Sequence, residues 1–303
     1  MAVYVVGDFL RETRLRKGYT QEEVSYGICT PASLSRIENG AQKPGRLILE
    51  KLFERLGTEN NLFNSFVSKE EMELYSEIQT LIRDITDEDV ARLEKQIDVV
   101  EKMAQNASEL EHQCLYFAKG ELARQKEKDD AMAMEYYLKA IRITLPDFDG
   151  KNPLRNNLLT FDEIMIINAI AILHANNEDI MTALQLDMWL EDYMENKVVD
   201  GKMKTAKYPM ILYNLSCWFY DQQCYKEAVK IADTGIDFCV KYGNLAAFPR
   251  LVLNKGVSLA ECGEIDKAQK YLHQAIIIFE AMQRIDTVQL INTWCKDHYQ
   301  LEV

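Results

Sequence analysis

Apolar residues along the first 57 positions fall into four short segments with helical spacing, and each segment is followed by a glycine. We predict helices over about residues 8–17, 20–27, 30–39 and 46–56, closed by Gly18, Gly27, Gly40 and Gly57. Thr20 and Glu23 have the spacing of a capping box, and Thr30-Pro31 places an N-cap before a proline at the first helical position. The short turn at residues 28–29 is the turn that a helix-turn-helix requires.

From about residue 68 onward the helical periodicity continues to the end with almost no strand pattern, and it contains a repeat. At offsets of 12, 16 and 19, Ser216 is followed by Ala228, Ala232 and Gly235, and Gly256 by Ala268, Leu272 and Ala275. This spacing is typical of the tetratricopeptide (TPR) helix pair, in which small residues let two helices approach closely. Two weaker copies, each needing one inserted residue, start near Gly120 and Ile170. The sequence therefore predicts an all-α chain, with a helix-turn-helix domain over residues 1–67 and a right-handed TPR-like α-solenoid over residues 68–303.

The charge of the chain divides at the same boundary. The whole chain has a formal net charge of −13, of which residues 1–67 contribute +1 and residues 68–303 contribute −14. An acidic body repels DNA phosphates, which suppresses non-specific binding and leaves attachment to the one domain that is not acidic. Duplex DNA therefore remains an expected partner.

The composition does not indicate a membrane protein, a metal site or an enzyme. No apolar run reaches the roughly 18 residues needed to span a bilayer, and the start lacks the basic segment of a secretion signal. The seven cysteines contain no CxxC pair and are interpreted as reduced, mostly core residues. The four histidines have no metal-ligand spacing, and no phosphate-binding glycine loop or catalytic triad is recognisable. We expect a soluble, cytoplasmic protein that is not an enzyme and needs no cofactor or metal.

In a helix-turn-helix, the second helix of the pair enters the major groove and presents its first side chains to base edges. The candidate base-reading residues are Pro31, Ala32, Ser33, Ser35 and Arg36. Phosphate contacts, which fix the register on DNA, are expected from Gln21 and Lys43. The alternative is a helical bundle without a role in DNA binding, but the complete helix-turn-helix spacing is much more specific than any one of its parts.

The segment LRETRLRKGYTQEEVSYGICTPASLSRIENGAQKP resembles the XRE-type, lambda-repressor-like helix-turn-helix. Arg14 and Glu38 match that family's internal pair, which ties the first helix to the reading helix. Combined with helical repeats, the chain resembles the peptide-pheromone-responsive regulators of Gram-positive bacteria, the PlcR, Rgg and PrgX group. It is most similar to PlcR-like members through ICTPASLSRIENG, INAIAILHANN and YNLSCWFYDQQCYKEA. The resemblance covers essentially the whole chain.

This resemblance implies that a short signalling oligopeptide, secreted, processed and re-imported, lies in the concave groove of the repeats and is held through its backbone. Asn168, Asn214 and Asn254 occupy the matching inward position on the first helix of three successive repeats, and a carboxamide can both donate and accept. The alternative for each asparagine is a hydrogen bond between helices of the solenoid. The other candidates for peptide binding, each with a surface or packing role as its alternative, are Arg83, Arg250 and Tyr213.

These features predict a quorum-sensing-type transcription regulator. A homodimer whose repeat domains pair would carry two helix-turn-helix domains to the half-sites of an inverted repeat in double-stranded operator DNA. Peptide binding would change the pitch of the solenoid and hence the orientation of the two DNA-binding domains. The first alternative is a regulator of the same architecture whose groove binds a protein partner rather than a peptide. The second, an enzyme or an enzyme-inhibiting repeat protein, is disfavoured by the DNA-binding domain.

Overall fold

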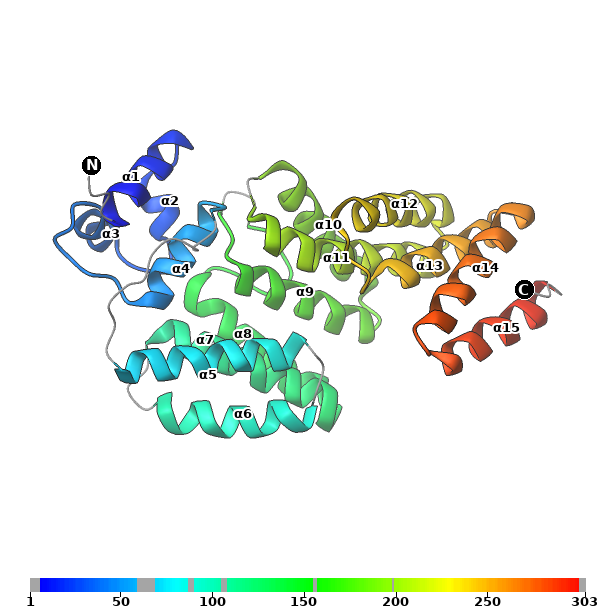
Figure 1. Cartoon of the computed structure of the whole chain (residues 1–303), viewed down its shortest axis with the longest axis horizontal. Coiled ribbons are helices and arrows are strands. Elements are labelled where there is room, and N and C mark those ends of the chain that lie inside the picture. The colour runs from blue at the N-terminus through cyan, green and yellow to red at the C-terminus, as the bar shows by residue number, and fades with distance from the viewer. Residues whose placement is uncertain are drawn as a thin grey trace. The chain divides into compact units, whose positions relative to one another are not determined.

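The computed structural model describes residues 6–58, 69–86, 90–104, 108–154, 157–197 and 199–299 (Figure 1). Within these ranges every regular element is a helix, which confirms the predicted all-α class. The chain forms two compact units, Met1–His174 with Lys197–Asp200, and Ala175–Asn196 with Gly201–Val303. The expected domain boundary near residue 68 lies outside the described residues, so it stays a prediction.

The first four helices lie where the sequence predicts them, with ends within two residues of the predicted ones. They are α1 (Val6–Arg16), α2 (Gln21–Ser25), α3 (Pro31–Glu38) and α4 (Arg46–Arg55). The four glycines expected to close them all have positive φ, between 56° and 76°. The capping box at α2 is formed, because Thr20 Oγ1 accepts from the backbone N–H of Glu23 while the Glu23 carboxylate accepts from that of Thr20 at 2.7 Å. At α3, Thr30 Oγ1 accepts from the backbone N–H of Ser33 at 3.1 Å.

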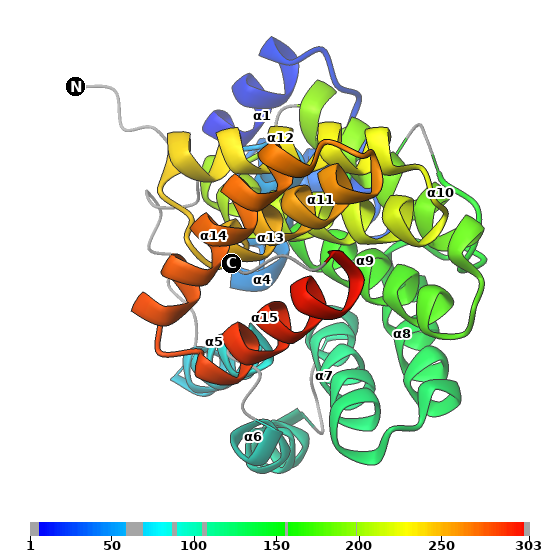
Figure 2. The same cartoon turned by 90° about the vertical axis from the view of Figure 1, so that its right-hand side faces the viewer.

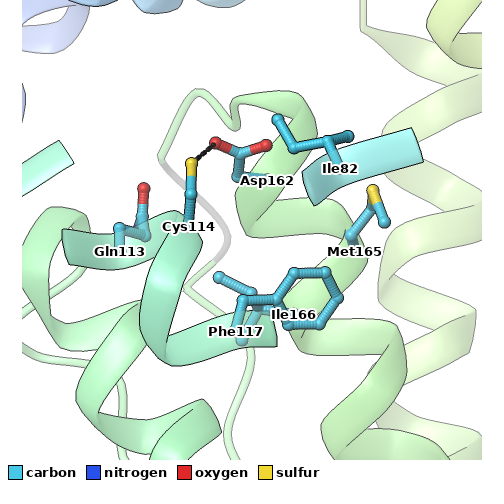
Figure 3. Close-up of a pocket in the computed structure, with 7 residues that line it drawn as sticks. All are labelled: Ile82, Gln113, Cys114, Phe117, Asp162, Met165 and Ile166. Carbon is cyan, nitrogen blue, oxygen red and sulfur yellow. Dashed lines mark hydrogen bonds between the residues drawn. The ribbon is translucent and has the colours of Figure 1, made fainter. Parts of the chain in front are cut away.

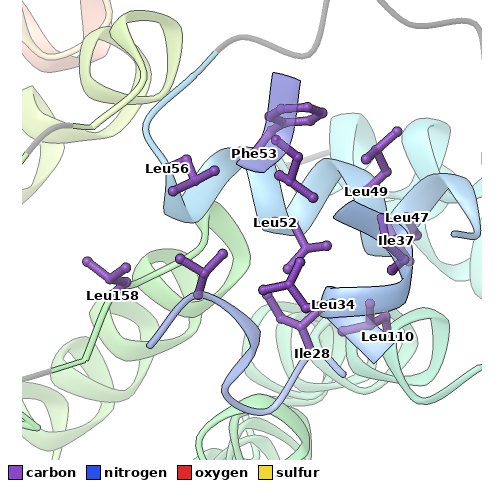
Figure 4. Packing of buried hydrophobic residues seen from close by; sticks show 12 residues of the cluster. Ile28, Leu34, Ile37, Leu47, Leu49, Leu52, Phe53, Leu56, Leu110 and Leu158 are labelled. Atoms are coloured by element: carbon purple, nitrogen blue, oxygen red, sulfur yellow. The ribbon is translucent and has the colours of Figure 1, made fainter. Parts of the chain in front are cut away.

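The core of this four-helix module extends beyond the module itself (Figure 4). Its buried members within the module are Leu10, Val24, Ile28, Leu34, Ile37, Leu47, Leu49, Leu52, Phe53 and Leu56. Leu110 and Leu158, from much later in the sequence, belong to the same cluster and are also buried. The helix-turn-helix therefore shares its hydrophobic core with the rest of the first unit.

The rest of the first unit consists of helices packed side by side. They are α5 (Lys69–Thr86), α6 (Val90–Met103), α7 (Glu109–Leu122), the π-helical turn η2 (Ala123–Glu127), α8 (Asp130–Thr144) and α9 (Phe161–Asn176) up to His174. Helix α5 packs against α6 and α7, and α7 lies beside α8 in both views (Figures 1 and 2). A Cβ atom on Gly120 would lie 2.4 Å from the ring of Tyr137, so this approach of α7 to α8 needs the small residue.

The second unit continues the pattern of helix pairs. Its elements are α10 (Ile180–Asn196), α11 (Gly201–Asp221), α12 (Tyr225–Tyr242), α13 (Phe248–Glu261), α14 (Ile265–Ala281) and α15 (Ile285–Tyr299). A Cβ atom on Gly256 would lie 3.0 Å from Leu272 Cγ, which confirms the close contact of α13 with α14 that the small-residue spacing predicts. The two helices of the weaker repeat near Ile170 belong to different units, because α9 lies in the first unit up to His174 and α10 lies in the second.

The described part of the chain contains no helix that is both long and apolar enough to cross a bilayer. It also contains no group of three or more His, Cys, Asp or Glu side chains placed to hold a metal ion. All seven cysteines are free thiols, but only Cys114, Cys239 and Cys295 are buried, and Cys224 is exposed. The expectation of mostly core cysteines therefore holds for three of the seven, because several lie at helix ends or on partly exposed faces.

Candidate DNA-binding and ligand-binding surfaces

Helix α3 has one buried and one accessible face. Leu34, Ile37 and Glu38 are buried against the rest of the module. The five residues expected to face bases, Pro31, Ala32, Ser33, Ser35 and Arg36, are all exposed or half-buried. A base-reading helix needs this placement, because its first turns must fit into the major groove without competing contacts.

The accessible face of α3 carries a small network that holds Arg36. Its Nη2 donates to Ser33 Oγ at 3.1 Å, and its Nε donates to Gln42 Oε1 at 3.0 Å. Thr30 Oγ1 in turn donates to Ser33 Oγ at 3.0 Å. A guanidinium held at one edge is pre-organised to offer its other N–H groups to a ligand. Gln42 was not expected in this role, because it follows the helix in a turn where no periodicity points to it.

An ion pair inside the module ties α1 to α3. Arg14 donates from Nε and Nη2 to the two oxygens of Glu38 at 2.6 and 2.8 Å, and the hydrogen bonds to Glu38 raise the pKa of Arg14. Gln21 Nε2 also donates to Glu38, at 2.7 Å. The phosphate contact expected of Gln21 must therefore use the amide hydrogen that Glu38 does not take. Lys43, the other candidate phosphate ligand, is exposed in the turn after α3.

In the first unit, the two candidate peptide-binding residues lie on different helices. Asn168 is half-buried in the middle of α9. Arg83 lies on α5 with a largely exposed side chain, and its Nε is 4.0 Å from Asp84 Oδ1. Asp84 is buried and lies closer to Arg92, at 2.9 Å, so the contact with the exposed Arg83 is the longer of the two and leaves the Arg83 guanidinium able to engage another anion.

In the second unit, Asn214 on α11 and Asn254 on α13 are placed alike, and both are half-buried. Asn214 Nδ2 lies 3.5 Å from Asp187 Oδ2, and Asn254 Nδ2 donates to Ser216 Oγ at 2.8 Å. Both amide nitrogens therefore take part in contacts between helices, as the packing alternative predicts. An amide whose nitrogen is held in this way can offer its oxygen to the N–H group of a bound peptide.

Two residues missed by the sequence reasoning hold these asparagines. Burial raises the pKa of Asp187 well above its usual range, against a smaller opposite effect of the Asn214 hydrogen bond, so this carboxyl is held towards its neutral form. Cys217 Sγ accepts from Asn254 Nδ2 at 3.3 Å, and burial raises the pKa of the Cys217 thiol to about 11. The sequence alone gives neither the burial of Asp187 nor the asparagine that each residue contacts, because both depend on how neighbouring helices pack.

Tyr213, Cys217, Arg250 and Asn254 form one cluster. The Arg250 guanidinium lies over the Tyr213 ring at 5.8 Å from its centre, and the Tyr213 hydroxyl interacts with Cys217. Burial is the main reason that the pKa of Tyr213 is raised. The structure thus brings together three of the six residues expected to bind peptide, Tyr213, Arg250 and Asn254.

Sequence comparison identifies the N-terminal module. Residues 5–66 match the family described as helix-turn-helix domain. YqaF of Bacillus subtilis (strain 168), an uncharacterized HTH-type transcriptional regulator, is 38% identical over 63 residues, which cover 20% of this chain and 83% of the relative. The family match thus spans α1–α4.

Structural comparison covers almost the whole chain. PlcR of Bacillus thuringiensis, solved in complex with the peptide PapR7 and DNA, is similar with a TM-score of 0.60 at 18% identity, over 94% of this chain and 98% of that one. The apo form of the competence regulator ComR from Streptococcus vestibularis is similar with a TM-score of 0.50 at 14% identity, over 96% of this chain and 97% of that one. At these identities the likeness establishes the fold, a helix-turn-helix followed by TPR-like helices, as the resemblance in the sequence implied. Residues 5–66 match the helix-turn-helix domain, and the chain is 38% identical to YqaF over 83% of that protein. The chain therefore belongs to the helix-turn-helix transcriptional regulators.

Proposed function

We propose that this regulator binds operator DNA as a homodimer in the cytoplasm and is controlled by a short signalling peptide bound to its TPR-like helices. The observation that carries the proposal is the similarity in fold to PlcR along nearly the full length of both chains, since PlcR was solved with a peptide and DNA together. A DNA-binding module of this size makes few base contacts, so two copies on an inverted repeat would give the affinity that one lacks.

The DNA-binding half of the proposal is supported by the accessible face of α3 and the placement of Arg36. Footprinting of the full-length protein on DNA that it selects from random sequence should give two half-sites, centred about one helical turn or a multiple of it apart. A single unpaired footprint, together with a monomeric mass in solution, would contradict the homodimer.

The peptide-binding half is supported by the half-buried cluster of Tyr213, Arg250 and Asn254 and by the matching placement of Asn214. A carboxamide oxygen recognises the backbone of any peptide, while Arg250 would pair with a carboxylate of the ligand. The ligand class that fits this cluster is therefore an extended peptide with at least one acidic group.

The test is native mass spectrometry of the full-length protein expressed in the species from which it comes. The expected result is an additional mass of a short peptide, which is lost in Asn254→Ala and retained in Asn292→Ala, an exposed asparagine on α15. Recovery of a protein-sized partner in place of a peptide would favour the alternative in which the groove binds a protein.

A further inference from the structure

The helix-turn-helix module is attached to the rest of the first unit by buried charged side chains. Lys51 Nζ on α4 lies 2.9 Å from Asp162 Oδ2, and Arg55 Nη2 on α4 lies 2.7 Å from Glu163 Oε1. The exposed fractions of these four side chains are at most 6%. Asp162 and Glu163 form the first turn of α9, so two cations of the DNA-binding module face two carboxylates more than 100 positions away in the sequence.

A third carboxylate joins α4 to the backbone of α9. Glu54 Oε2 accepts from the backbone N–H of Phe161 at 2.9 Å, and Glu54 Oε1 accepts from Lys51 Nζ at 3.1 Å. The first N–H groups of a helix have no partner within the helix and attract negative charge. Glu54 thus satisfies a donor that α9 itself leaves unpaired, and the start of α9 is completed by a side chain of the DNA-binding module.

The turn between α2 and α3 makes a second contact between the helix-turn-helix module and the rest of the first unit. Arg55 Nη1 donates to the backbone oxygen of Tyr26, and the Tyr26 hydroxyl donates to Asp147 Oδ2 at 2.6 Å. A Cβ atom on Gly27 would lie only 2.0 Å from the backbone oxygen of Thr144, the last residue of α8. Arg55 therefore links the turn of the helix-turn-helix, helix α4 and helix α9 through one guanidinium.

The surroundings of Asp162 are largely apolar. Asp162 borders a small pocket between α5, α7 and α9 (Figure 3). Its other lining residues are Ile82, Gln113, Cys114, Phe117, Met165 and Ile166. Cys114 Sγ donates to Asp162 Oδ2 at 3.6 Å. A charge left unpaired in such surroundings is strongly destabilising, so the contacts of α4 with α9 are expected to open together or not at all.

We propose that Lys51, Arg55, Asp162 and Glu163 are positioning residues for DNA recognition, which fix the reading helix α3 and helix α9 in one rigid body. The contact leaves the base-facing side of α3 accessible, so it orients the reading helix without covering it. Asn168 lies on α9 six residues after Asp162. A displacement of α9 by a ligand at Asn168 would therefore turn α3 with it. This regulatory consequence rests on the proposed peptide control, whereas the rigid attachment does not.

Hydrogen–deuterium exchange of the full-length protein, without DNA or peptide, tests the attachment. In the wild type, the amide of Phe161 and the amides of α4 should exchange slowly and at similar rates. Glu163→Gln keeps the side-chain shape and leaves the Arg55 guanidinium without its carboxylate, so exchange in both segments should rise together, by about 100-fold or more. The matched control is Glu135→Gln, which breaks the exposed pair with Lys139 in the same unit and should change neither segment.

A second pair of variants keeps the test decisive if Glu163→Gln fails to fold. Arg55→Met alone should accelerate exchange in both segments, and Arg55→Met combined with Glu163→Gln should reverse much of that increase, because no buried charge then remains unpaired at this position. Fast exchange of the Phe161 amide in the wild type, or acceleration confined to the mutated helix, would overturn the rigid attachment.

Selection of DNA with randomised half-site spacing separates positioning from plain stability. Glu163→Gln should accept a wider range of spacings than the wild type while keeping the same base preference within each half-site. A purely structural role predicts weaker binding with unchanged spacing preference, and that result would overturn the positioning role. Selection of single half-sites by the wild type would contradict the proposed homodimer. The rigid attachment of α4 to α9 would then be judged by hydrogen–deuterium exchange alone.

Discussion

The contact between Gly27 and Thr144 gives the sharpest test of how the helix-turn-helix is built into the first unit. We predict that Gly27→Ala is far more destabilising than Gly18→Ala. Both glycines close a helix with similar positive φ, +69° and +76°, but a Cβ atom on Gly18 would meet nothing within 4 Å. The two substitutions therefore differ mainly in whether the added methyl group has space.

The expected magnitudes follow from these geometries. An alanine held in the left-handed region costs about 1–2 kcal/mol, which is the whole effect expected for Gly18→Ala. At Gly27 the methyl carbon would lie 2.0 Å from a carbonyl oxygen and 2.7 Å from Thr144 Cα, both backbone atoms that no side-chain rotation can move. Relieving this overlap must separate the turn from α8 and strain the buried pair of Arg55 with Glu163, which adds at least about 3 kcal/mol.

The assay is chemical denaturation of both variants beside the wild type, followed by far-ultraviolet circular dichroism. Gly27→Ala should lose about 4 kcal/mol or more of unfolding free energy, a large part of the roughly 5–15 kcal/mol typical of a folded domain. Equal losses in Gly27→Ala and Gly18→Ala would refute the close packing of this turn against α8.

Three further predictions concern DNA, ligand and pH. Ser33→Ala combined with Arg36→Ala should weaken binding to the selected operator by about 2–5 kcal/mol in gel-shift titrations, and undiminished specific affinity would rule out α3 as the reading helix. Asn254→Ala should weaken binding of the peptide recovered from the native cells by about 1–3 kcal/mol in calorimetry, whereas a lower melting temperature with unchanged affinity would assign Asn254 to helix packing alone. Burial raises the pKa of Glu54 from 4.5 to about 7; the charge of Lys51 opposes this shift, and the charges of Asp162 and Glu50 reinforce it. Because the pKa is higher in the folded state, the stability that protonated Glu54 contributes is complete below pH 4.5 and is lost as the pH rises through about 7. Glu54→Gln should flatten this part of the pH–stability profile measured by denaturation, and an unchanged slope would contradict the shift.

The parts of the structure that depend on local chemistry were predictable from the sequence. Capping residues and terminal glycines act within one turn of their own helix, so Thr20, Thr30 and Gly40 marked the module's helices correctly. The spacing of Gly256 and Leu272 likewise predicted a helix pair, because close approach requires a small residue at a fixed offset.

The contacts that join segments distant in the sequence were not predictable. Lys51, Arg55, Asp162 and Glu163 look like ordinary surface charges in their own helices, and only the folded chain buries them against one another. Gln21 is likewise expected from the sequence to contact a phosphate, but the pattern did not predict that its amide donates to the buried Glu38. Patterns of single segments carry no information on such pairings, because they depend on where two helices meet.

Ligand-dependent binding of this protein to DNA can be measured in one titration. The full-length protein is titrated onto its selected operator with and without the peptide-sized fraction of a culture of the native species, in the wild type, Asn254→Ala and the control Asn292→Ala. We predict that this fraction changes the operator affinity of the wild type and of Asn292→Ala, and that Asn254→Ala responds much less. No response in the wild type, or an equal response in Asn254→Ala, would contradict peptide control through this cluster.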